Sequence, residues 1–319
     1  MSGKKYKVFV DGSEGTTGLR IGQRLAARQD VELLAIDPAL RKDAGERARL
    51  LDSADVAFLC LPDAAAKESA ALLQNPETVL IDASTAHRTA PGWAYGLPEL
   101  GPEYREALTT AKRIAVPGCH ASGFNLLVHP LVRAGVLPAD YPVVCHSVTG
   151  YSGGGKGMIA SYEADRRSEL LDSPRQYALG LAHKHLPEMQ SYGGLAFPPL
   201  FNPIVGDFYA GMAVSVPLHS RLLKGAPTAQ ELHTLLADYY AGQQMVTVAP
   251  FGGGPFTADG FLAAGQLAGR DNLVIIVTGH DAQLQLVALS DNLGKGASGA
   301  AVQCMNIALG LEQATGLVL

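Results

Sequence analysis

The chain has 319 residues, of which 47 % are apolar and 17 % charged, with 36 glycines and a formal net charge of −5 at pH 7. This length predicts two domains, and the composition excludes a disordered chain. No Lys or Arg block is long enough to bind a nucleic-acid backbone, so we expect no nucleic-acid partner. The longest apolar run, 56–61, is too short to span a membrane, as is the run 273–277, and no apolar signal segment opens the sequence. We therefore expect a soluble, cytoplasmic protein.

A glycine-rich turn follows the first predicted strand, Lys7–Val10. Its glycines are spaced G-x-x-G-x-x-G, and a helical pattern to about residue 28 and a strand ending at Asp37 come next. This is the order of a dinucleotide-binding βαβ unit, in which the glycines let a pyrophosphate approach the helix N-terminus. The alternative is an ordinary tight turn. The predicted cofactor-loop residues are Gly12, Ser13, Gly15, Thr16, Thr17 and Gly18.

The choice of nicotinamide cofactor depends on the residues after the second strand. Asp37 stands where a carboxylate accepts hydrogen bonds from the adenosine ribose, which favours NAD. Arg41 and Lys42 follow closely and suit the 2′-phosphate of NADP. These residues leave both cofactors open.

Alternating helices and strands continue to Asp82. Helices are predicted at 44–51 and 64–73, and strands at 56–61 and 79–82. Because the strands are apolar almost throughout, we expect a doubly wound parallel sheet covered on both faces. Ser84 and Arg88 follow at a strand's carboxyl end, where ligands of such sheets collect. Ser84 is a predicted cofactor contact and Arg88 a predicted substrate contact, with a surface salt bridge as the alternative for the arginine.

Cys119 follows a β-branched run, 114–116, and the dipeptide Pro117-Gly118, and an apolar, helix-compatible stretch begins there. A helix N-terminus favours a thiolate over a thiol and can stabilise an oxyanion. Cys119 is therefore the predicted nucleophile; a small buried apolar side chain is the alternative. The other cysteines lie in apolar or helical runs without CxxC spacing, which indicates neither a disulfide framework nor a metal site.

Two further motifs follow the strand predicted at 143–148. Three consecutive glycines, a lysine and a helix start predict an anion-binding nest for the substrate, a flexible turn being the alternative. In the segment 182–190, His183 and His185 alternate, and Pro187 presets a helix turn that includes Glu188. One histidine is a predicted acid/base and Glu188 the group that orients it, while incidental surface histidines are the alternative. The predicted nest residues are Ser152, Gly153, Gly154 and Lys156.

The remainder of the chain predicts an α+β arrangement with a mixed or antiparallel sheet. Strands are expected at 209–216, 246–249, 273–278 and 283–289, with a helix at 229–240. The segment after Asp291 is rich in small residues such as Gly296, which permit close backbone approach to a cofactor or a helix.

Six motifs, in this order along nearly the whole chain, carry a family resemblance. They are DGSEGTTG, DASTAHRT, VPGCHASG, TGYSGGGKG, HKHLPEM and DNLGKGASGAAVQ. Together they resemble the shorter type of the N-acetyl-gamma-glutamyl-phosphate reductase family. The resemblance implies NADPH-dependent reduction of N-acetyl-gamma-glutamyl phosphate to N-acetylglutamate 5-semialdehyde and phosphate in arginine biosynthesis. It also implies a fold like that of glyceraldehyde-3-phosphate dehydrogenase and a homo-oligomer, which we expect to be a homodimer or homotetramer.

The resemblance also assigns domains and roles. It implies a nucleotide domain, 1–118, completed by the C-terminal helix 292–319, and a catalytic and oligomerisation domain, 119–291. Cys119 matches the nucleophile and His185 the acid/base, with His183 beside it, while Asn292 and Gly296 match a segment near the nicotinamide. One departure is clear: the family pattern has Asn before Pro-Gly-Cys and Tyr-Pro-Thr-Gly after it, whereas here Val116 precedes the motif and His120-Ala121-Ser122-Gly123 follow.

The expected chemistry uses a cysteinyl thioester, because an acyl phosphate is a poor hydride acceptor. Two other functions remain open at this point. A related acyl-phosphate reductase, for example of aspartyl phosphate, would keep the chemistry and change the small-molecule substrate. A non-catalytic NADP-binding sensor would keep the glycine loop without needing a reactive thiol.

Overall fold

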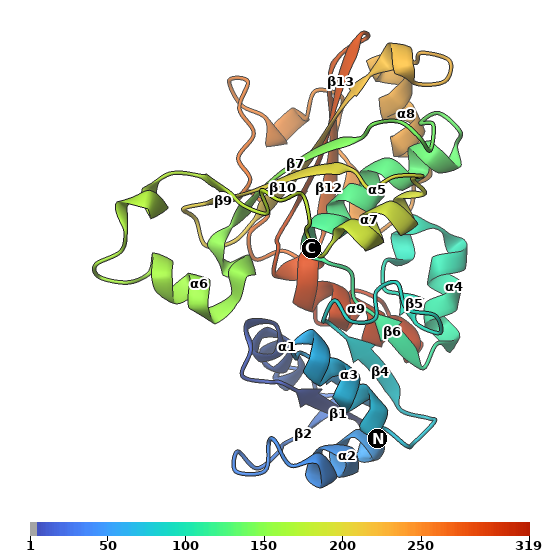
Figure 1. The fold of residues 1–319 in the computed structure, drawn as a ribbon. Coiled ribbons are helices and arrows are strands. Elements are labelled where there is room, and N and C mark those ends of the chain that lie inside the picture. Colours follow the sequence, from blue (N-terminus) through green and yellow to red (C-terminus); the bar gives the residue numbers. More distant parts are fainter. Residues whose placement is uncertain (1–4) are drawn as a thin grey trace. The chain divides into compact units, whose positions relative to one another are not determined.

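The computed structural model describes residues 5–319, and the chain divides into two compact units (Figure 1). Unit 1 comprises the chain up to Pro117 together with Ala297–Leu317. Unit 2 comprises Gly118–Gly296 together with Val318–Leu319. The predicted C-terminal segment 292–319 is thus divided between the units: residues 292–296 belong to unit 2, and the last helix belongs to unit 1. Among residues 5–319, no helix is both long enough and apolar enough to cross a membrane.

The sheet of unit 1 has six strands in the order β2-β1-β3-β4-β6-β5, and all its strand pairs are parallel. The strands are β1 (Tyr6–Asp11), β2 (Val31–Leu34), β3 (Val56–Leu59), β4 (Val79–Asp82), β5 (Ala94–Tyr95) and β6 (Arg113–Ala115). The strand order reverses at β1 and β3, where such sheets bind ligands at the carboxyl ends of the strands. The predicted doubly wound sheet is confirmed.

Helices cover both faces of this sheet. They are α1 (Thr16–Ala26), α2 (Ala44–Ser53), α3 (Asp63–Leu72), α4 (Pro102–Thr110) and α9 (Gly299–Ala308). Adjacent residues of β1 enter opposite apolar layers, because side chains alternate along a strand. Val8 packs in a cluster with α1 and α9, whereas Phe9 packs in a cluster with α2 and α3. The C-terminal helix α9 is therefore part of the core of unit 1.

The sheet of unit 2 has seven strands in the order β11-β12-β13-β10-β7-β9-β8. The strands are β7 (Val144–Gly150), β8 (Arg175–Gln176), β9 (Leu200–Gly206), β10 (Met212–His219), β11 (Val246–Val248), β12 (Leu273–His280) and β13 (Gln283–Ser290). The pairs β7/β9 and β11/β12 are parallel and the others antiparallel, so the predicted mixed sheet is confirmed.

The helices of unit 2 are α5 (Cys119–Arg133), α6 (Gly155–Tyr162), α7 (Leu186–Gly193) and α8 (Ala229–Tyr239). Helices α5 and α7 lie side by side (Figure 1), and α5 also packs on β10 and β13. That packing is tight, since a Cβ added at Gly123 would lie 2.8 Å from the Val214 side chain. The sheet therefore fixes the position of α5, whose first residue is Cys119.

One predicted strand ends earlier than expected, and one seven-residue strand was not predicted. The second strand ends at Leu34 instead of Asp37, because the Asp37 side chain accepts a hydrogen bond from the Ala39 N–H and Pro38 follows it, which makes a turn. Strand β9 has no counterpart in the prediction. It contains Pro203, a residue that argues against a strand inside a sheet, yet it pairs with β7 and β8.

Candidate active site

Cys119 is the first residue of α5, four residues after the end of β6, so the predicted strand-to-helix turn is present. Gly118 is the N-cap residue in an extended conformation, and no side chain caps the helix. The first turn carries no acidic side chain that would offset the partial positive charge of the helix N-terminus. The thiol is partly exposed. This position favours a thiolate and suits a developing oxyanion.

Glu188 anchors this turn from the neighbouring helix α7. Its Oε2 accepts a hydrogen bond of 3.1 Å from the backbone N–H of Gly118, the residue before Cys119. Glu188 is only 1 % exposed, so the bond is shielded from water. The contact shown is thus with the backbone of the thiol turn, and the orienting role toward a histidine stays a prediction.

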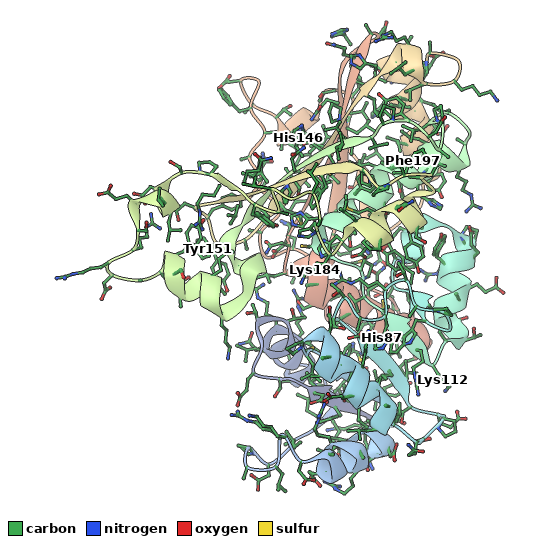
Figure 2. All side chains as sticks on the ribbon, in the orientation of Figure 1. His87, Lys112, His146, Tyr151, Lys184 and Phe197 are labelled. Atoms are coloured by element: carbon green, nitrogen blue, oxygen red, sulfur yellow. The ribbon has the colours of Figure 1, made fainter. Side chains whose placement is uncertain are left out.

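His183 and His185 lie together, as their alternation predicts. Their ring centroids are 4.7 Å apart and nearly perpendicular, and the His185 backbone N–H donates to His183 Nδ1 at 3.2 Å. His185 is the N-cap residue of α7 and is 5 % exposed, while Pro187 lies in the first turn of that helix. Between the two histidines, Lys184 is exposed (Figure 2). The structure thus brings together two of the predicted catalytic side chains.

A third histidine, His120, completes this cluster, although no sequence motif predicts a role for it. Its ring centroid lies 5.7 Å from that of His183 and 5.5 Å from that of His185. Burial and the charges of His183 and Lys184 lower the pKa of His120 to about 3. The signal in the sequence is the departure from the family pattern directly after Cys119.

The segment after β13 joins two predicted site residues to this region. Gly296 packs against Cys119, and Asn292 is 2 % exposed. The Asn292 amide donates to Ser152 Oγ at 3.0 Å, and its oxygen accepts from the Gly211 N–H at 2.8 Å. Asn292 therefore ties the glycine-rich turn to Gly211, the residue before β10, and its predicted contact with the cofactor stays a prediction.

The glycine-rich turn differs from the predicted nest in its backbone. Gly154 has φ −81° and ψ 1°, but Gly155 has φ 75° and ψ −171°, so the two do not form an alternating right- and left-handed pair. The Gly155 N–H is also used, since it donates to the Ser152 carbonyl. Ser152 is buried, whereas Gly153, Gly154 and Lys156 are exposed. The positive features open to an anion here are the start of α6 and the Lys156 ammonium.

The predicted cofactor loop in unit 1 has the close contacts that require glycine. Gly12 has φ +88°, and a Cβ there would lie 2.4 Å from the Cys60 carbonyl oxygen. A Cβ at Gly18 would lie 2.4 Å from the Gly12 carbonyl oxygen. Gly15 is the N-cap residue of α1, with no side chain over the helix start. The loop also carries Ser13, Thr16 and Thr17. Because Gly12, Gly15 and Gly18 add no side chains, the loop fits a pyrophosphate at the N-terminus of α1.

Asp37 and Arg41 both lie on the surface near this loop. Asp37 is exposed, three residues beyond the end of β2. Arg41 forms an ion pair of 2.6 Å with Glu14, which lies inside the glycine loop. A guanidinium therefore stands beside the loop, where an adenosine 2′-phosphate would find a positive partner.

Ser84 and Arg88 are each 8 % exposed and bonded within unit 1. Ser84 Oγ donates to Asp82 at 2.7 Å, and Arg88 Nε donates to the Val116 carbonyl at 2.9 Å. Asp82 also bonds His87 Nδ1 at 2.7 Å, and the His87 ring (Figure 2) stacks on Trp93. Arg88 is thus a buried side chain rather than a surface one, and its contact with substrate stays a prediction.

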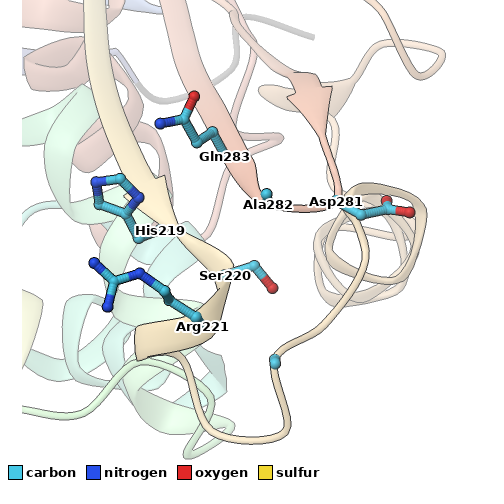
Figure 3. Close-up of a pocket in the computed structure, with 7 residues that line it drawn as sticks. His219, Ser220, Arg221, Asp281, Ala282 and Gln283 are labelled. Carbon is cyan, nitrogen blue, oxygen red and sulfur yellow. The ribbon is translucent and has the colours of Figure 1, made fainter.

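A pocket of about 420 Å³ lies at one end of the β10–β13 pair (Figure 3). His219 and Gln283 line it and pair with each other, whereas Ser290, which leads to the Cys119 region, pairs with Met212 at the opposite end. The seven residues that line the pocket include none of the predicted site residues. We therefore assign it no part in the reaction.

Comparison with known proteins identifies the class. Residues 39–109 match the NAD binding domain of semialdehyde dehydrogenases, and residues 119–292 match their dimerisation domain. Aspartate semialdehyde dehydrogenase II from Vibrio cholerae, complexed with ASA, has this fold, with a TM-score of 0.70, 16 % identity, and coverage of 96 % of this chain and 99 % of that one. The fold and the site therefore define a semialdehyde dehydrogenase-type protein.

Closer relatives define the family. A Nostoc protein named N-acetyl-gamma-glutamyl-phosphate reductase 2 is 47 % identical, covering 98 % of this chain and 99 % of the relative. The N-acetyl-gamma-glutamyl-phosphate reductase of Brucella anthropi is 49 % identical, covering 96 % of this chain and 99 % of its own. The chain belongs to the N-acetyl-gamma-glutamyl-phosphate reductase family.

Proposed function

We propose that this chain reduces N-acetyl-gamma-glutamyl phosphate to N-acetylglutamate 5-semialdehyde with NADPH, releasing phosphate, as a step of arginine biosynthesis. Family membership supports the reaction and substrate. The observation that carries the proposal is the position of Cys119, a partly exposed thiol at the first residue of α5, directly before His120, whose ring lies against the His185 ring. A non-catalytic NADP-binding sensor would not need a reactive thiol beside histidines.

The glycine loop of unit 1 fits NADP(H). Gly12 and Gly18 leave space that a Cβ would fill, so the pyrophosphate can approach the N-terminus of α1. When bound there, NADPH supplies the hydride for the reduction. Arg41 favours NADP(H), because its guanidinium can bind the 2′-phosphate. Asp37 gives less support to NAD, because a carboxylate that binds the ribose lies at the end of the second strand, and Asp37 lies three residues beyond it.

Cys119 performs the first covalent step. Its thiolate attacks the acyl carbon, and the carbon–oxygen bond to phosphate breaks with its electron pair on the leaving phosphate, so a thioester remains on sulfur. Each tetrahedral oxyanion forms at the start of α5, where backbone N–H groups and the helix dipole stabilise negative charge. Glu188 holds this turn in place through Gly118.

His185 supplies the proton chemistry, with His183 beside it. As an imidazolium it stabilises the thiolate. After hydride transfer it donates its proton to the thiohemiacetal oxyanion, and it takes the proton back as the carbon–sulfur bond breaks, so that the aldehyde leaves and the Cys119 thiolate is restored. The released phosphate carries negative charge that Lys156 and the exposed turn Gly153–Gly154 attract. Ser152 supports that turn through its bond to Asn292.

The matched dimerisation domain supports self-association, and we propose a homodimer or homotetramer in the cytoplasm. The substrate is a small molecule. Neither nucleic acid nor membrane is part of this proposal.

The test is the reverse reaction of the purified protein. NADP⁺ reduction is followed with N-acetylglutamate 5-semialdehyde with and without phosphate, in parallel with aspartate semialdehyde and with NAD⁺. Phosphate-dependent activity with the first aldehyde and NADP⁺ is the expected result. Activity with aspartate semialdehyde alone would overturn the substrate, and silence with both from protein that binds NADP⁺ would favour the sensor.

A further inference from the structure

His120 is bonded at both ring nitrogens by side chains from two other segments. Nδ1 lies 2.7 Å from Ser147 Oγ in β7, and Nε2 lies 2.9 Å from the hydroxyl of Tyr177, directly after β8. The residue is 3 % exposed and Ser147 is fully buried. Two short bonds in a shielded site hold the imidazole in one orientation.

The same ring contacts the side chains that surround the reaction. His183 meets it edge-on and His185 at a tilt, with centroids 5.7 and 5.5 Å away. Phe201 closes another side at 5.1 Å. His120 is therefore the common neighbour of both predicted acid/base histidines and of Tyr177, and it follows Cys119 in the chain.

His120 is uncharged at neutral pH, because burial and the charges of His183 and Lys184 lower its pKa to about 3. Burial and the negative charge of Cys119 raise the pKa of Tyr177, so its phenol also stays protonated. Both groups are therefore uncharged near pH 7. Both act as fixed dipoles beside the thiolate.

We propose that His120 is a positioning residue for the reaction at Cys119, which holds the Tyr177 hydroxyl and the rings of His183 and His185 in their working orientation. The inference rests on the proposed function and adds to it. It also explains why a histidine, with two hydrogen-bonding nitrogens, stands directly after the cysteine.

Two variants distinguish the hydrogen bonds made by the two ring nitrogens of His120. His120→Gln places an amide near the position of Nε2 and can keep the bond to Tyr177, whereas His120→Asn reaches only the Nδ1 side and Ser147. We expect His120→Asn to lower kcat at least about tenfold with KM changed less than about threefold, and His120→Gln to restore at least a third of the wild-type kcat. His146→Asn is the matched control, since His146 is exposed on β7 beside Ser147 (Figure 2).

Tyr177→Phe tests the same bond from the other side and covers the case in which a His120 variant does not fold. We expect it to lower kcat as His120→Asn does, and the double variant to be no slower than the slower single variant, because both changes remove one interaction. Thermal unfolding of every variant identifies losses that come from folding alone.

Three results would overturn the inference: unchanged kcat in Tyr177→Phe, equal loss in the Gln and Asn variants, or additive losses in the double variant. Each of these results counts against the inference only when the wild-type protein is active with N-acetylglutamate 5-semialdehyde. Wild-type protein that is inactive with this aldehyde would instead contradict the proposed function, and the inference with it. The two failures are thus distinguished in one assay series.

Discussion

Gly296 and Cys119 touch: a Cβ added at Gly296 would lie 2.7 Å from the Cys119 Cβ. The segment that follows β13 thus presses against the residue that we propose as nucleophile. A π-helical turn, Gly294–Ser298, carries this contact, and such turns are frequent at functional sites. The C-terminal part of unit 2 therefore holds the thiol turn in place from one side, as Glu188 holds it through Gly118.

Gly296→Ala tests that contact. The added methyl group must displace Cys119, so we expect kcat to fall by about 10- to 100-fold, as when reacting groups are misplaced by about 1 Å. We expect the free energy of unfolding to fall by about 1–3 kcal/mol. Gly265→Ala is the control, since a Cβ there meets only ordinary contacts. Equal kcat values for the two variants and the wild type would contradict this packing role.

Gly18→Ala tests the cofactor loop. Its Cβ would lie 2.4 Å from the Gly12 carbonyl oxygen, so the loop must open and we expect the Kd for NADPH to rise at least about tenfold, which is about 1.4 kcal/mol. Gly22→Ala, in the same helix with nothing within 4 Å, should leave the Kd unchanged and stabilise α1 by about 0.5–1 kcal/mol. Fluorescence titration with NADPH measures the Kd of both variants, and thermal unfolding measures their stability. Equal affinities in the two variants would place the cofactor elsewhere.

Arg41→Ala tests cofactor choice. If the guanidinium meets the 2′-phosphate, its loss should raise KM for NADPH about tenfold and leave KM for NADH nearly unchanged. Stability should hardly change, because the Arg41–Glu14 ion pair is exposed. A parallel rise of both KM values would exclude a specific role for Arg41.

Thiol alkylation should be selective for Cys119. Cys60 is partly exposed like Cys119, but desolvation and the charges of Asp82 and Asp11 raise its pKa. Burial likewise raises the pKa of Cys145, so both remain thiols at pH 7.5 and react slowly. Cys119 is partly exposed at a helix start, where the thiolate is favoured. Iodoacetamide followed by peptide mass mapping should find Cys119 modified first, and the substrate should protect it. Preferential labelling of Cys60 would contradict the account.

Local patterns in the sequence predicted the glycine loop and the thiol turn, because glycine spacing and a strand-to-helix turn depend on neighbouring residues. The sequence could not predict the meeting of His120 with Ser147 and Tyr177, which lie 27 and 57 residues away. Only tertiary packing brings them together. Similarly, β9 was not predicted because it contains Pro203, and β2 was predicted too long because the turn at Asp37 was not recognised. The backbone angles of Gly154 and Gly155 could not be predicted, because glycine permits several conformations and the pattern does not select one, so anion binding by Gly153, Gly154 and Lys156 stays a prediction.

The most direct test of the account is the intact mass of the protein after mixing with N-acetyl-gamma-glutamyl phosphate in the absence of NADPH. We expect one acyl group bound to Cys119, lost again when NADPH is added. Cys119→Ser should still bind NADPH but give no labile adduct, with turnover reduced by roughly 1000-fold or more. Normal turnover in Cys119→Ser, or an adduct on another residue that NADPH discharges, would contradict catalysis by the thiol at the start of α5.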